Sequence, residues 1–597
     1  MAAQIQAFLL GEQMPVVETT VDQRLWAGAG EAIRTVDGRR LHYEELRAAT
    51  DHLAADLVAQ GFQAGMPAGI VSSRTPEAIV AIFAVWKAGG TIVPIDAAWP
   101  AARVETALAA ANVTCAFIDG NTAQHPGAWR LKEFEWSLTG LIKGAAADPA
   151  PAYVIFTSGS TGVPKGVAVS HAALGNYLSW RAATLPLPPG FRVLAMASLG
   201  FDVMLREVVW PLTMGGTVVL LPDAQRMDSS LVVAALREHQ VDVVHMLSSM
   251  FEFVAAEPGL AELPHLKVVH ASAEPLPWAA VRRFRTVSRA ALHHSYGPTE
   301  AAISVTFLDC TDLPAMGTGS VPLGNPIANV EIHLRDEQLQ PVATGVAGEI
   351  CLAGACLAEG YVGAPEATAA AFVADPLSPQ RLLYRTGDRA VIAGDGSLVF
   401  RGRIDDQIKV RGYRIEPAEV EGALRRLGAR EAVVSSDLAG TQLVALVTGV
   451  PATNPQALRA ALADVLPPYV VPDRIHVLAA LDRTSSGKID RAAAVQRIHS
   501  GRLESVAVQG TAAHEPHGQA VFAAIAEVWS SVLGHPNPLP SDNFFDIGGN
   551  SMNAMRIVSR LRKKFGGRIQ VRLLFDHPVL ADLSATIGEQ FMPSDER

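Results

Sequence analysis

Short apolar runs alternate with helical patterns through the first two thirds of the chain. The run AGIVSS precedes the helical pattern PEAIVAIFAVWKAGG, and GTIVPID follows it. The series GTVVLLP, SLVVAALREHQ and VDVVHML repeats the same order. Strands separated by helices in this way are typical of layered α/β folds with largely parallel sheets. We therefore predict a large α/β core of layered sheets and helices over residues 1–403.

The pattern changes after this core. The segment FRGRIDDQIKVRGYRIEP is dense in charge, and a smaller α/β pattern follows it, which predicts a small α/β subdomain behind a hinge over residues 404–500. Residues 501–517 are rich in Gly, Ser, Ala, His and Pro without periodicity, as in a linker. Residues 518–592 are predicted to form a separate small helical bundle.

Two apolar stripes at helical spacing support this bundle. They comprise Val521, Phe522, Ile525, Val528, Trp529, Val532 and Leu533, and then Met552, Met555, Val558, Leu561 and Phe565.

Composition narrows the class of partner. Of the 597 residues, 49% are hydrophobic and 18% are charged, as in soluble globular proteins. A net charge of −10 argues against nucleic acid and against an anionic membrane as partner. The N-terminus lacks a cationic region followed by an apolar core, and no uninterrupted apolar run reaches the ~18 residues of a membrane span. We predict a cytoplasmic location.

The four cysteines are too few to build a disulfide scaffold in a chain of this length. They are Cys115, Cys310, Cys351 and Cys356. The pair in CLAGAC fits no zinc-ligand spacing, and no second pair accompanies it. We expect all four to be buried small hydrophobic side chains.

The segment TSGSTGVPKG, residues 157–166, is the strongest local motif. Its glycines allow backbone N–H groups to approach an anion, and its hydroxyls and lysine add further donors. It is not a Walker A motif, because the lysine follows a proline. The preceding AYVIF reads as a buried strand, which places the loop where α/β sheets bind ligands. We predict phosphate binding by Thr157, Ser158, Gly159, Ser160, Thr161, Gly162 and Lys165.

This loop resembles the phosphate loop of adenylate-forming enzymes, and further motifs of that superfamily follow in the expected order. They are LHYEEL (41–46), WKAGGTIVPID (86–96), HSYGPTEAAIS (294–304), GEICLAGACLAEGYV (348–362), YRTGD (384–388), GRIDDQIKVRGYRIE (402–416), LPPYVVP (466–472) and TSSGKIDR (484–491). The set resembles the adenylation domain of a nonribosomal peptide synthetase. The segment FFDIGGNSM (544–552) resembles the motif of a four-helix peptidyl carrier domain, in which 4′-phosphopantetheine is attached at the serine, here Ser551.

The resemblance implies a reaction and its residues. ATP and a carboxylate give an acyl-adenylate and pyrophosphate, and a thiol then takes the acyl group. Lys488 matches the lysine between carboxylate and phosphate, and Asp405 matches the hinge. The resemblance also assigns roles at the nucleotide: Tyr296 against adenine, Asp388 on the ribose hydroxyls, Arg403 on ribose or phosphate, Thr299 near the phosphates and Glu300 on Mg²⁺.

Asp202 matches the residue that binds the substrate α-amine in members that activate α-amino acids. The other matched pocket positions are Val203, Arg206, His245, His270, Ser272, Ser295, Ile303 and Ser304. This lining is polar, and an apolar side chain would leave its donors unpaired at ~1–3 kcal/mol each, so we expect a hydrophilic substrate.

Within that class the sequence leaves alternatives open. Four positions resemble the serine-activating pattern, namely Val203, His245, Ser272 and Ile303, and three depart from it, namely Arg206, His270 and Ser304. Serine is the leading candidate. An acidic relative such as O-phosphoserine or aspartate is an alternative, since arginine pairs bidentately with anions. In a further alternative, the Arg206 side chain points away from the pocket, toward Glu207 or solvent, and does not contact the substrate.

Two other function classes compete. An acyl-CoA-type ligase would release its product, but Asp202 and the fused bundle argue against it. A non-catalytic scaffold would predict loss of Lys488, Asp388 or Glu300, and all three are retained. The favoured interpretation implies ATP, Mg²⁺ and 4′-phosphopantetheine as cofactors. Its implied partners are an amino acid, a phosphopantetheinyl transferase and condensation or tailoring enzymes in trans, with a small helper protein as a further candidate.

Overall fold

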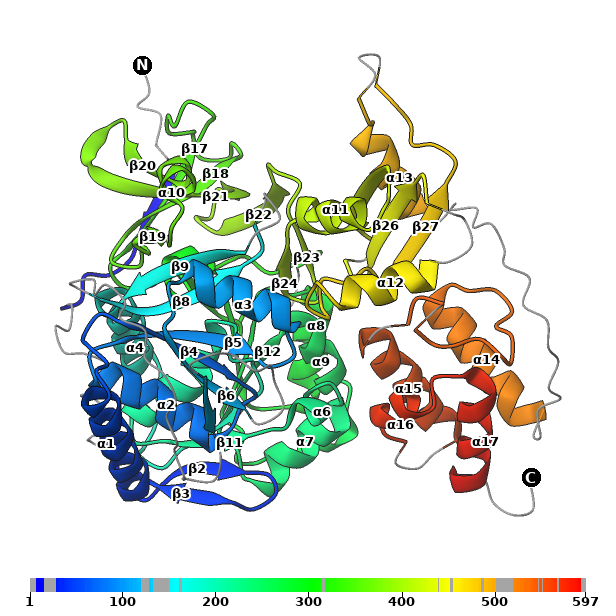
Figure 1. The fold of residues 1–597 in the computed structure, drawn as a ribbon, viewed down its shortest axis with the longest axis horizontal. Coiled ribbons are helices and arrows are strands. Elements are labelled where there is room, and N and C mark those ends of the chain that lie inside the picture. Colours follow the sequence, from blue (N-terminus) through cyan, green and yellow to red (C-terminus); the bar gives the residue numbers. More distant parts are fainter. Residues whose placement is uncertain are drawn as a thin grey trace. The chain divides into compact units, whose positions relative to one another are not determined.

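The computed structural model confirms the predicted α/β multidomain class with a helical C-terminal region (Figure 1). It divides into two compact units, described separately below: residues 1–158, 164–223 and 233–406 form the first, and residues 159–163, 224–232 and 407–597 the second. The residues that the structure describes are 7–15, 28–119, 128–131, 150–159, 164–313, 317–438, 440–450, 455–484, 488–500, 519–545, 547–549, 551–565 and 569–591.

One sheet of the first unit has the strand order β19-β9-β8-β5-β4-β6-β7. Its strands are β4 (Pro67–Ser72), β5 (Thr91–Asp96), β6 (Cys115–Asp119), β7 (Ala128–Leu131), β8 (Pro151–Thr157), β9 (Lys165–Ser170) and β19 (Gly360–Tyr361). The predicted strand–helix–strand series appears here as β4, α2 (Pro76–Lys87) and β5, with β4 and β5 parallel. Helix α2 is apolar on every side because it is buried throughout, and α1 (Tyr43–Ala59) packs beside it.

A second sheet has the order β16-β15-β14-β13-β12-β10-β11-β2-β3. Its strands are β2 (Glu31–Thr35), β3 (Arg40–His42), β10 (Arg192–Ala195), β11 (Thr217–Leu220), β12 (Val243–Leu247), β13 (Val268–Ser272), β14 (Ala291–Ser295), β15 (Thr306–Asp309) and β16 (Asn325–Pro326). The strands β2, β11, β10, β12, β13 and β14 are parallel to their neighbours in that order, so their carboxyl ends share one edge.

A third, antiparallel sheet completes the first unit, in the order β1-β17-β18-β21-β20 with β22 beside β21. These strands are β1 (Phe8–Leu10), β17 (Val330–Arg335), β18 (Gly348–Gly354), β20 (Phe372–Asp375), β21 (Ser378–Ile392) and β22 (Leu398–Arg403). The helices of the unit are α1, α2, α3 (Ala101–Ala110), α4 (His171–Thr184), α5 (Trp210–Thr213), α8 (Ser248–Val254), α9 (Trp278–Val287) and α10 (Pro365–Ala371). The four cysteines are buried and unpaired with one another, as expected.

The second unit begins with a small α/β region. The strands β23 (Ile408–Val410) and β24 (Tyr413–Ile415) form a hairpin, and β25 (Glu431–Ser436), β26 (Leu443–Thr448) and β27 (Arg474–Leu478) form a sheet. Its helices are α11 (Pro417–Arg426), α12 (Pro455–Ala463) and α13 (Arg491–Ser500). Helices α6 (Asp223–Arg226) and α7 (Ser229–Glu238) lie at the boundary of the two units along the chain.

The chain ends in a helical region formed by α14 (Gln519–Leu533), α15 (Ser551–Phe565), α16 (Val571–Asp576) and α17 (Leu580–Phe591) (Figure 1). The predicted stripes form its core: Ile525 and Trp529 on α14 and Leu561 on α15 are fully buried. The linker predicted over 501–517 lies outside the described residues. In the part of the chain that the structure describes, no helix is both long enough and apolar enough to cross a membrane.

Candidate active site

Three neighbouring parallel strands bring the predicted pocket residues together. His245 on β12, His270 on β13 and His293 on β14 stand opposite one another in register. Two residues further along, Ser272 and Ser295 are also opposite one another. Side chains two positions apart in a strand share one face, so all five lie on the same side of the sheet. They approach the edge at which parallel α/β sheets bind ligands.

Arg206 joins these side chains into one buried network. Its Nη2 donates to Ser272 Oγ at 2.9 Å, and its Nη1 lies 3.2 Å from His270 Nε2. His270 Nε2 is in turn 2.7 Å from Ser295 Oγ, which is 3.1 Å from Ser304 Oγ. Every member is at least 94% buried. Five of the positions matched by motif thus lie in direct contact, and three of them, Arg206, His270 and Ser272, lie outside the HSYGPTEAAIS segment.

The alternative in which Arg206 turns toward Glu207 does not fit this geometry. The Glu207 carboxylate accepts the backbone N–H groups of Met196 and Ala197, at 2.6 and 2.7 Å. Arg206 itself is 1% exposed, so it does not reach solvent either. It lies in a π-helical turn, Leu205–Val209, a conformation that is rare and frequent at functional sites.

Asp202 lies one turn before Arg206 and is 8% exposed. Burial raises the pKa of its carboxyl group to about 6, and Glu300 acts in the same direction. The Arg206 guanidinium and hydrogen bonds from the Thr299 side chain and the Val203 backbone oppose that shift. A buried carboxylate with a raised pKa gains from a cation beside it, as an α-ammonium group would be.

This pKa predicts a pH dependence. Below pH 6 Asp202 becomes protonated and loses its attraction for an ammonium group, so kcat/KM for the amino acid should fall as the pH drops through about 6. The loss should approach tenfold per pH unit below that value. The measurement is kcat/KM in ATP–pyrophosphate exchange from pH 5 to 8. A profile flat between pH 5 and 7 would contradict the role of Asp202, and Asp202→Asn should be slow at every pH.

Two residues of the pocket turn have a strained backbone. Ala302 and Ile303 have φ values of 49° and 73°, and such a value is a genuine outlier for a β-branched residue. Gly297 packs against this turn so closely that a Cβ atom there would lie 2.5 Å from Ser304 Cα. Strain of this kind costs ~1–3 kcal/mol and persists where the surrounding packing imposes it.

The residues assigned to the nucleotide form a second group in the same unit. Tyr296 Oη donates to Asp388 Oδ2 at 2.6 Å, and Arg403 Nη1 donates to Asp388 Oδ1 at 2.5 Å. Each carboxylate oxygen accepts two hydrogen bonds, so Asp388 keeps acceptor capacity for ribose hydroxyls. Arg403 also binds both oxygens of Asp405, at 2.6 and 2.7 Å, and so connects the predicted ribose and hinge positions.

Glu300 is 1% exposed and accepts a hydrogen bond from Tyr361 Oη at 2.8 Å. The Lys165 ammonium lies 5.3 Å from the centroid of the Tyr361 ring. The residue from the phosphate motif and the predicted magnesium ligand therefore face the same tyrosine. One carboxylate suits Mg²⁺, which usually takes one or two carboxylates together with substrate phosphates. In the described ranges, no cluster of three or more His, Cys, Asp or Glu side chains forms a separate metal site.

The phosphate motif begins at the end of a buried strand, as predicted. Thr157 is the last residue of β8 and pairs directly with Lys165, the first residue of β9. Ser158 and Gly159 follow β8 along the chain. Ser160, Thr161 and Gly162 lie outside the described residues.

Lys488 and Ser551 belong to the second unit. Lys488 is exposed, and its backbone carbonyl accepts the N–H of Thr484 at 2.8 Å. Ser551 is the first residue of α15. Gly548 has a φ of 94°, and a Cβ atom on Gly549 would lie 2.3 Å from the Phe544 carbonyl oxygen. The tight turn before the serine therefore requires both glycines.

Sequence reasoning missed three residues in or beside these groups, namely His293, Tyr361 and Arg181. The Arg181 guanidinium lies against the Trp210 ring, which in turn contacts His245. Arg181 carried a detectable signal, because Leu174, Tyr177, Leu178 and Arg181 follow the i, i+3, i+4, i+7 spacing of one buried helix face. An arginine on a buried helix face is unusual, so its position in this pattern indicates a specific role. Tyr361 lies within the matched motif GEICLAGACLAEGYV but was given no role, and His293 carried no comparable signal.

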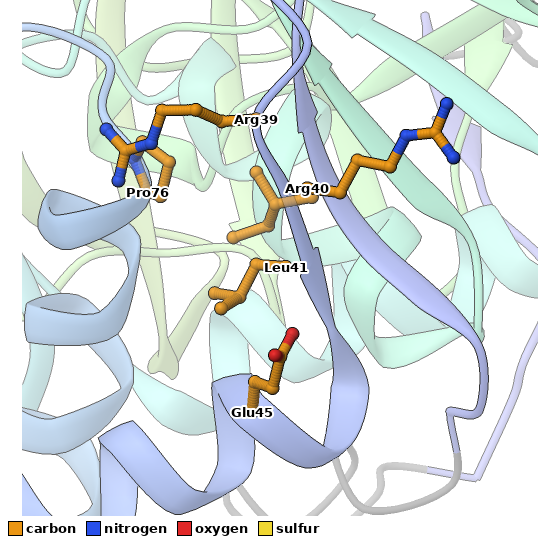
Figure 2. Close-up of a pocket in the computed structure, with 6 residues that line it drawn as sticks. Arg39, Arg40, Leu41, Glu45 and Pro76 are labelled. Atoms are coloured by element: carbon orange, nitrogen blue, oxygen red, sulfur yellow. The ribbon is translucent and has the colours of Figure 1, made fainter.

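A hollow elsewhere in the first unit contains none of these residues. It has a volume of about 340 Å³ and is lined by Ile33, Arg39, Arg40, Leu41, Glu45 and Pro76. Figure 2 shows the guanidinium groups of Arg39 and Arg40 pointing away from each other. Arg39 pairs with Glu77 at 2.5 Å, so its charge has a partner within the fold. This arrangement does not converge on a ligand.

Comparison with protein families gives three matches along the chain. The AMP-binding enzyme family matches residues 23–362, the C-terminal domain of AMP-binding enzymes matches 419–488, and the phosphopantetheine attachment site matches 523–587. The first covers more than half of the chain.

Similar proteins include phosphinothricin tripeptide synthetase PhsC of Streptomyces viridochromogenes, 36% identical over 92% of this chain and 51% of its own length. Tyrocidine synthase 2 of Brevibacillus parabrevis is 33% identical over 92% of this chain and 15% of its own length. This chain thus spans about half, or less, of these relatives.

Among solved structures, the chain is similar to holo-PA1221, a nonribosomal peptide synthetase protein with adenylation and carrier domains. The TM-score is 0.80 at 27% identity, covering 97% of this chain and 98% of that one. The chain therefore belongs to the AMP-binding enzyme family, with the adenylation–carrier arrangement of nonribosomal peptide synthetases.

Proposed function

We propose that the chain activates an α-amino acid and loads it onto its own carrier domain. ATP and the amino acid give aminoacyl-AMP and pyrophosphate. The thiol of phosphopantetheine on Ser551 then attacks the acyl carbon and releases AMP, forming a thioester. The buried Asp202, beside a polar network and with a raised pKa, carries this proposal, because it suits an α-ammonium group.

The proposed roles follow from charge. Negative charge develops on the α-phosphate during carboxylate attack, and cations placed there stabilise it. Lys488 would supply one such charge, and Mg²⁺, held through Glu300 and the phosphates, would neutralise another. Asp388 and Arg403 would bind the ribose, with Tyr296 beside the base.

The polar network supports a hydrophilic substrate. Arg206, His270, Ser272, Ser295 and Ser304 already hydrogen-bond one another, so an apolar side chain would leave their remaining donors and acceptors unpaired. Four positions of the pocket resemble the pattern of adenylation domains that activate serine. An acyl-CoA-type ligase is disfavoured, because a fatty or aryl acid offers no ammonium group to the buried Asp202.

The test is amino-acid-dependent ATP–pyrophosphate exchange with the full-length chain. We expect exchange with a hydrophilic amino acid and none with its des-amino analogue. Exchange supported by valine or phenylalanine in preference to every hydrophilic amino acid would contradict the proposal.

The hinge assignment gives a separate prediction. Asp405→Pro should slow thioester formation ~10-fold or more while leaving adenylation near wild type, since proline fixes φ where the backbone must rotate. The comparison is pyrophosphate exchange against loading of the carrier. Asp405→Ala is the control, because it removes the ion pair with Arg403 and keeps backbone freedom. Equal losses in both half-reactions would contradict a hinge at this position.

A further inference from the structure

A second arginine lies buried close to the Arg206 network. Arg181, on α4, is 0% exposed, and its Cζ lies 5.1 Å from the centroid of the Trp210 ring. Contacts continue from Trp210 to His245 at 6.3 Å between centroids, and from His245 to His270 at 5.4 Å. His270 contacts Arg206. The two guanidinium groups therefore border one continuous cluster of aromatic and imidazole rings.

Neither guanidinium has a carboxylate partner in this cluster. None of the three Arg181 nitrogens has a hydrogen-bond partner among the described residues, and Nε of Arg206 also lacks one. Both ring nitrogens of His245 and Nδ1 of His270 are likewise unpartnered there. A buried cation without a partner is costly, and native proteins normally balance it with an anion.

The electrostatics agree with this excess of positive charge. Burial, with added repulsion from Arg206, lowers the pKa of Arg181 to about 10, so it stays protonated at neutral pH. Burial and the two arginines lower the pKa of His245 and His270 well below the usual value, so these imidazoles are neutral. Among these rings and guanidinium groups, the fixed charge is thus that of the two guanidinium groups. The carboxyl groups of Asp202 and Glu207, whose pKa values burial raises to about 6, act on Arg206 from beside the cluster.

The two carboxyl groups that interact electrostatically with Arg206, those of Asp202 and Glu207, have other partners. Glu207 accepts two backbone N–H groups. Asp202 is the partner of the substrate α-ammonium under the proposed function. An anion supplied by the substrate would therefore be the counterion of the cluster.

Spacing sets the length of that substrate. Asp202 lies in the turn that leads into the π-helical segment Leu205–Val209, four residues before Arg206. The two side chains are close enough for the Arg206 charge to act on the Asp202 carboxyl group. An α-amino acid held through its ammonium at Asp202 needs only a short side chain to reach Arg206. Two guanidinium groups match the two charges of a phosphoryl or phosphonyl group better than the single charge of a carboxylate.

We propose that Arg206 and Arg181 form a buried anion subsite that selects an α-amino acid whose short side chain ends in an anionic group, with a doubly charged phosphoryl or phosphonyl group preferred. Arg206 binds the anion bidentately through its planar fork. Arg181 supplies the second charge from behind Trp210 and acts as a positioning residue. This inference rests on the proposed function, because it assumes that Asp202 holds the ammonium.

The test is a panel of amino acids in ATP–pyrophosphate exchange with the full-length chain. O-Phospho-L-serine, L-aspartate and L-glutamate form the anionic arm, and L-serine, L-asparagine and L-valine form the neutral arm. We expect kcat/KM for the best anionic substrate to exceed that for every neutral one at least tenfold, with O-phospho-L-serine above L-aspartate. L-Serine or L-asparagine in first place would overturn the anion subsite and leave the proposed function standing. L-Valine in first place would overturn both the anion subsite and the hydrophilic substrate of the proposed function. Exchange with no amino acid would overturn both.

Single substitutions test which residues produce the preference for an anionic substrate. Arg206→Met should lower kcat/KM for the anionic substrate ~30–100-fold, mainly through KM, and Arg181→Met ~10-fold. Arg206→Lys should recover part of the loss, because it restores charge without the fork. Arg103→Met is the matched control, since Arg103 is also buried against a tryptophan, 4.9 Å from the Trp99 ring.

The melting temperature of each variant shows whether it is folded. If a variant is unfolded, the substrate preference of the wild-type chain in the amino-acid panel still tests the proposal. Unchanged selectivity in folded Arg206→Met would overturn it.

Discussion

Ser551→Ala should abolish covalent loading of the chain and leave amino-acid-dependent pyrophosphate exchange unchanged. This result is expected because, in the proposed function, Ser551 only carries the phosphopantetheine arm and has no part in the first half-reaction. The serine opens α15 after a turn that requires Gly548 and Gly549, so the chain places it at a helix start, as suits a point of attachment.

The measurement is incorporation of labelled amino acid into acid-precipitated protein after treatment with coenzyme A and a phosphopantetheinyl transferase. Ser559→Ala, eight residues further along the same helix, is the matched control and should load normally. Loading retained by Ser551→Ala would contradict the assignment of the attachment site.

Lys488→Ala should lower kcat for adenylation by ~10²–10³, with a smaller effect on the KM for ATP. In the proposed function the lysine charge would stabilise the transition state, in which charge builds on the α-phosphate, more than the ground state. Pyrophosphate exchange at saturating ATP measures the loss. Lys563→Ala, another exposed lysine in the second unit, is the control and should be unaffected.

A second readout separates this role from misfolding. Chemically prepared aminoacyl-AMP bypasses the first half-reaction, so holo Lys488→Ala supplied with it should load its carrier at close to the wild-type rate. Exchange within twofold of wild type would contradict the catalytic role of Lys488. Failure to load from aminoacyl-AMP would contradict its restriction to the first half-reaction.

Much of this molecule follows from local sequence pattern. Alternating strands and helices predict the layered α/β core, and the AYVIF run before TSGSTGVPKG places the phosphate motif at the end of β8, where the structure has it. The apolar stripes predict α14 and α15 because helix period and burial are local properties of a segment. Motif spacing also identifies the side chains of the Arg206 network.

The rest depends on strand order and on contacts between distant segments. Strand β10 lies between β11 and β12 in the sheet, although it precedes both in the sequence, and alternation of strands and helices carries no information on that order. Arg181 meets Trp210 only because α4 packs against α5. The hydrogen bond from Tyr361 to Glu300 spans 61 residues. Local periodicity does not predict such pairs, so the position of Arg181 against Trp210, beside the pocket, emerges only in three dimensions.

Under the proposed function, this chain charges its own carrier domain with an amino acid that it has itself activated. Intact-protein mass measurement tests that claim directly. The chain treated with coenzyme A and a phosphopantetheinyl transferase should gain the mass of one phosphopantetheine arm. On addition of ATP, Mg²⁺ and the preferred amino acid it should gain one aminoacyl group, which hydroxylamine removes. No gain with coenzyme A, or an arm that stays unloaded with every amino acid that supports exchange, would contradict the claim.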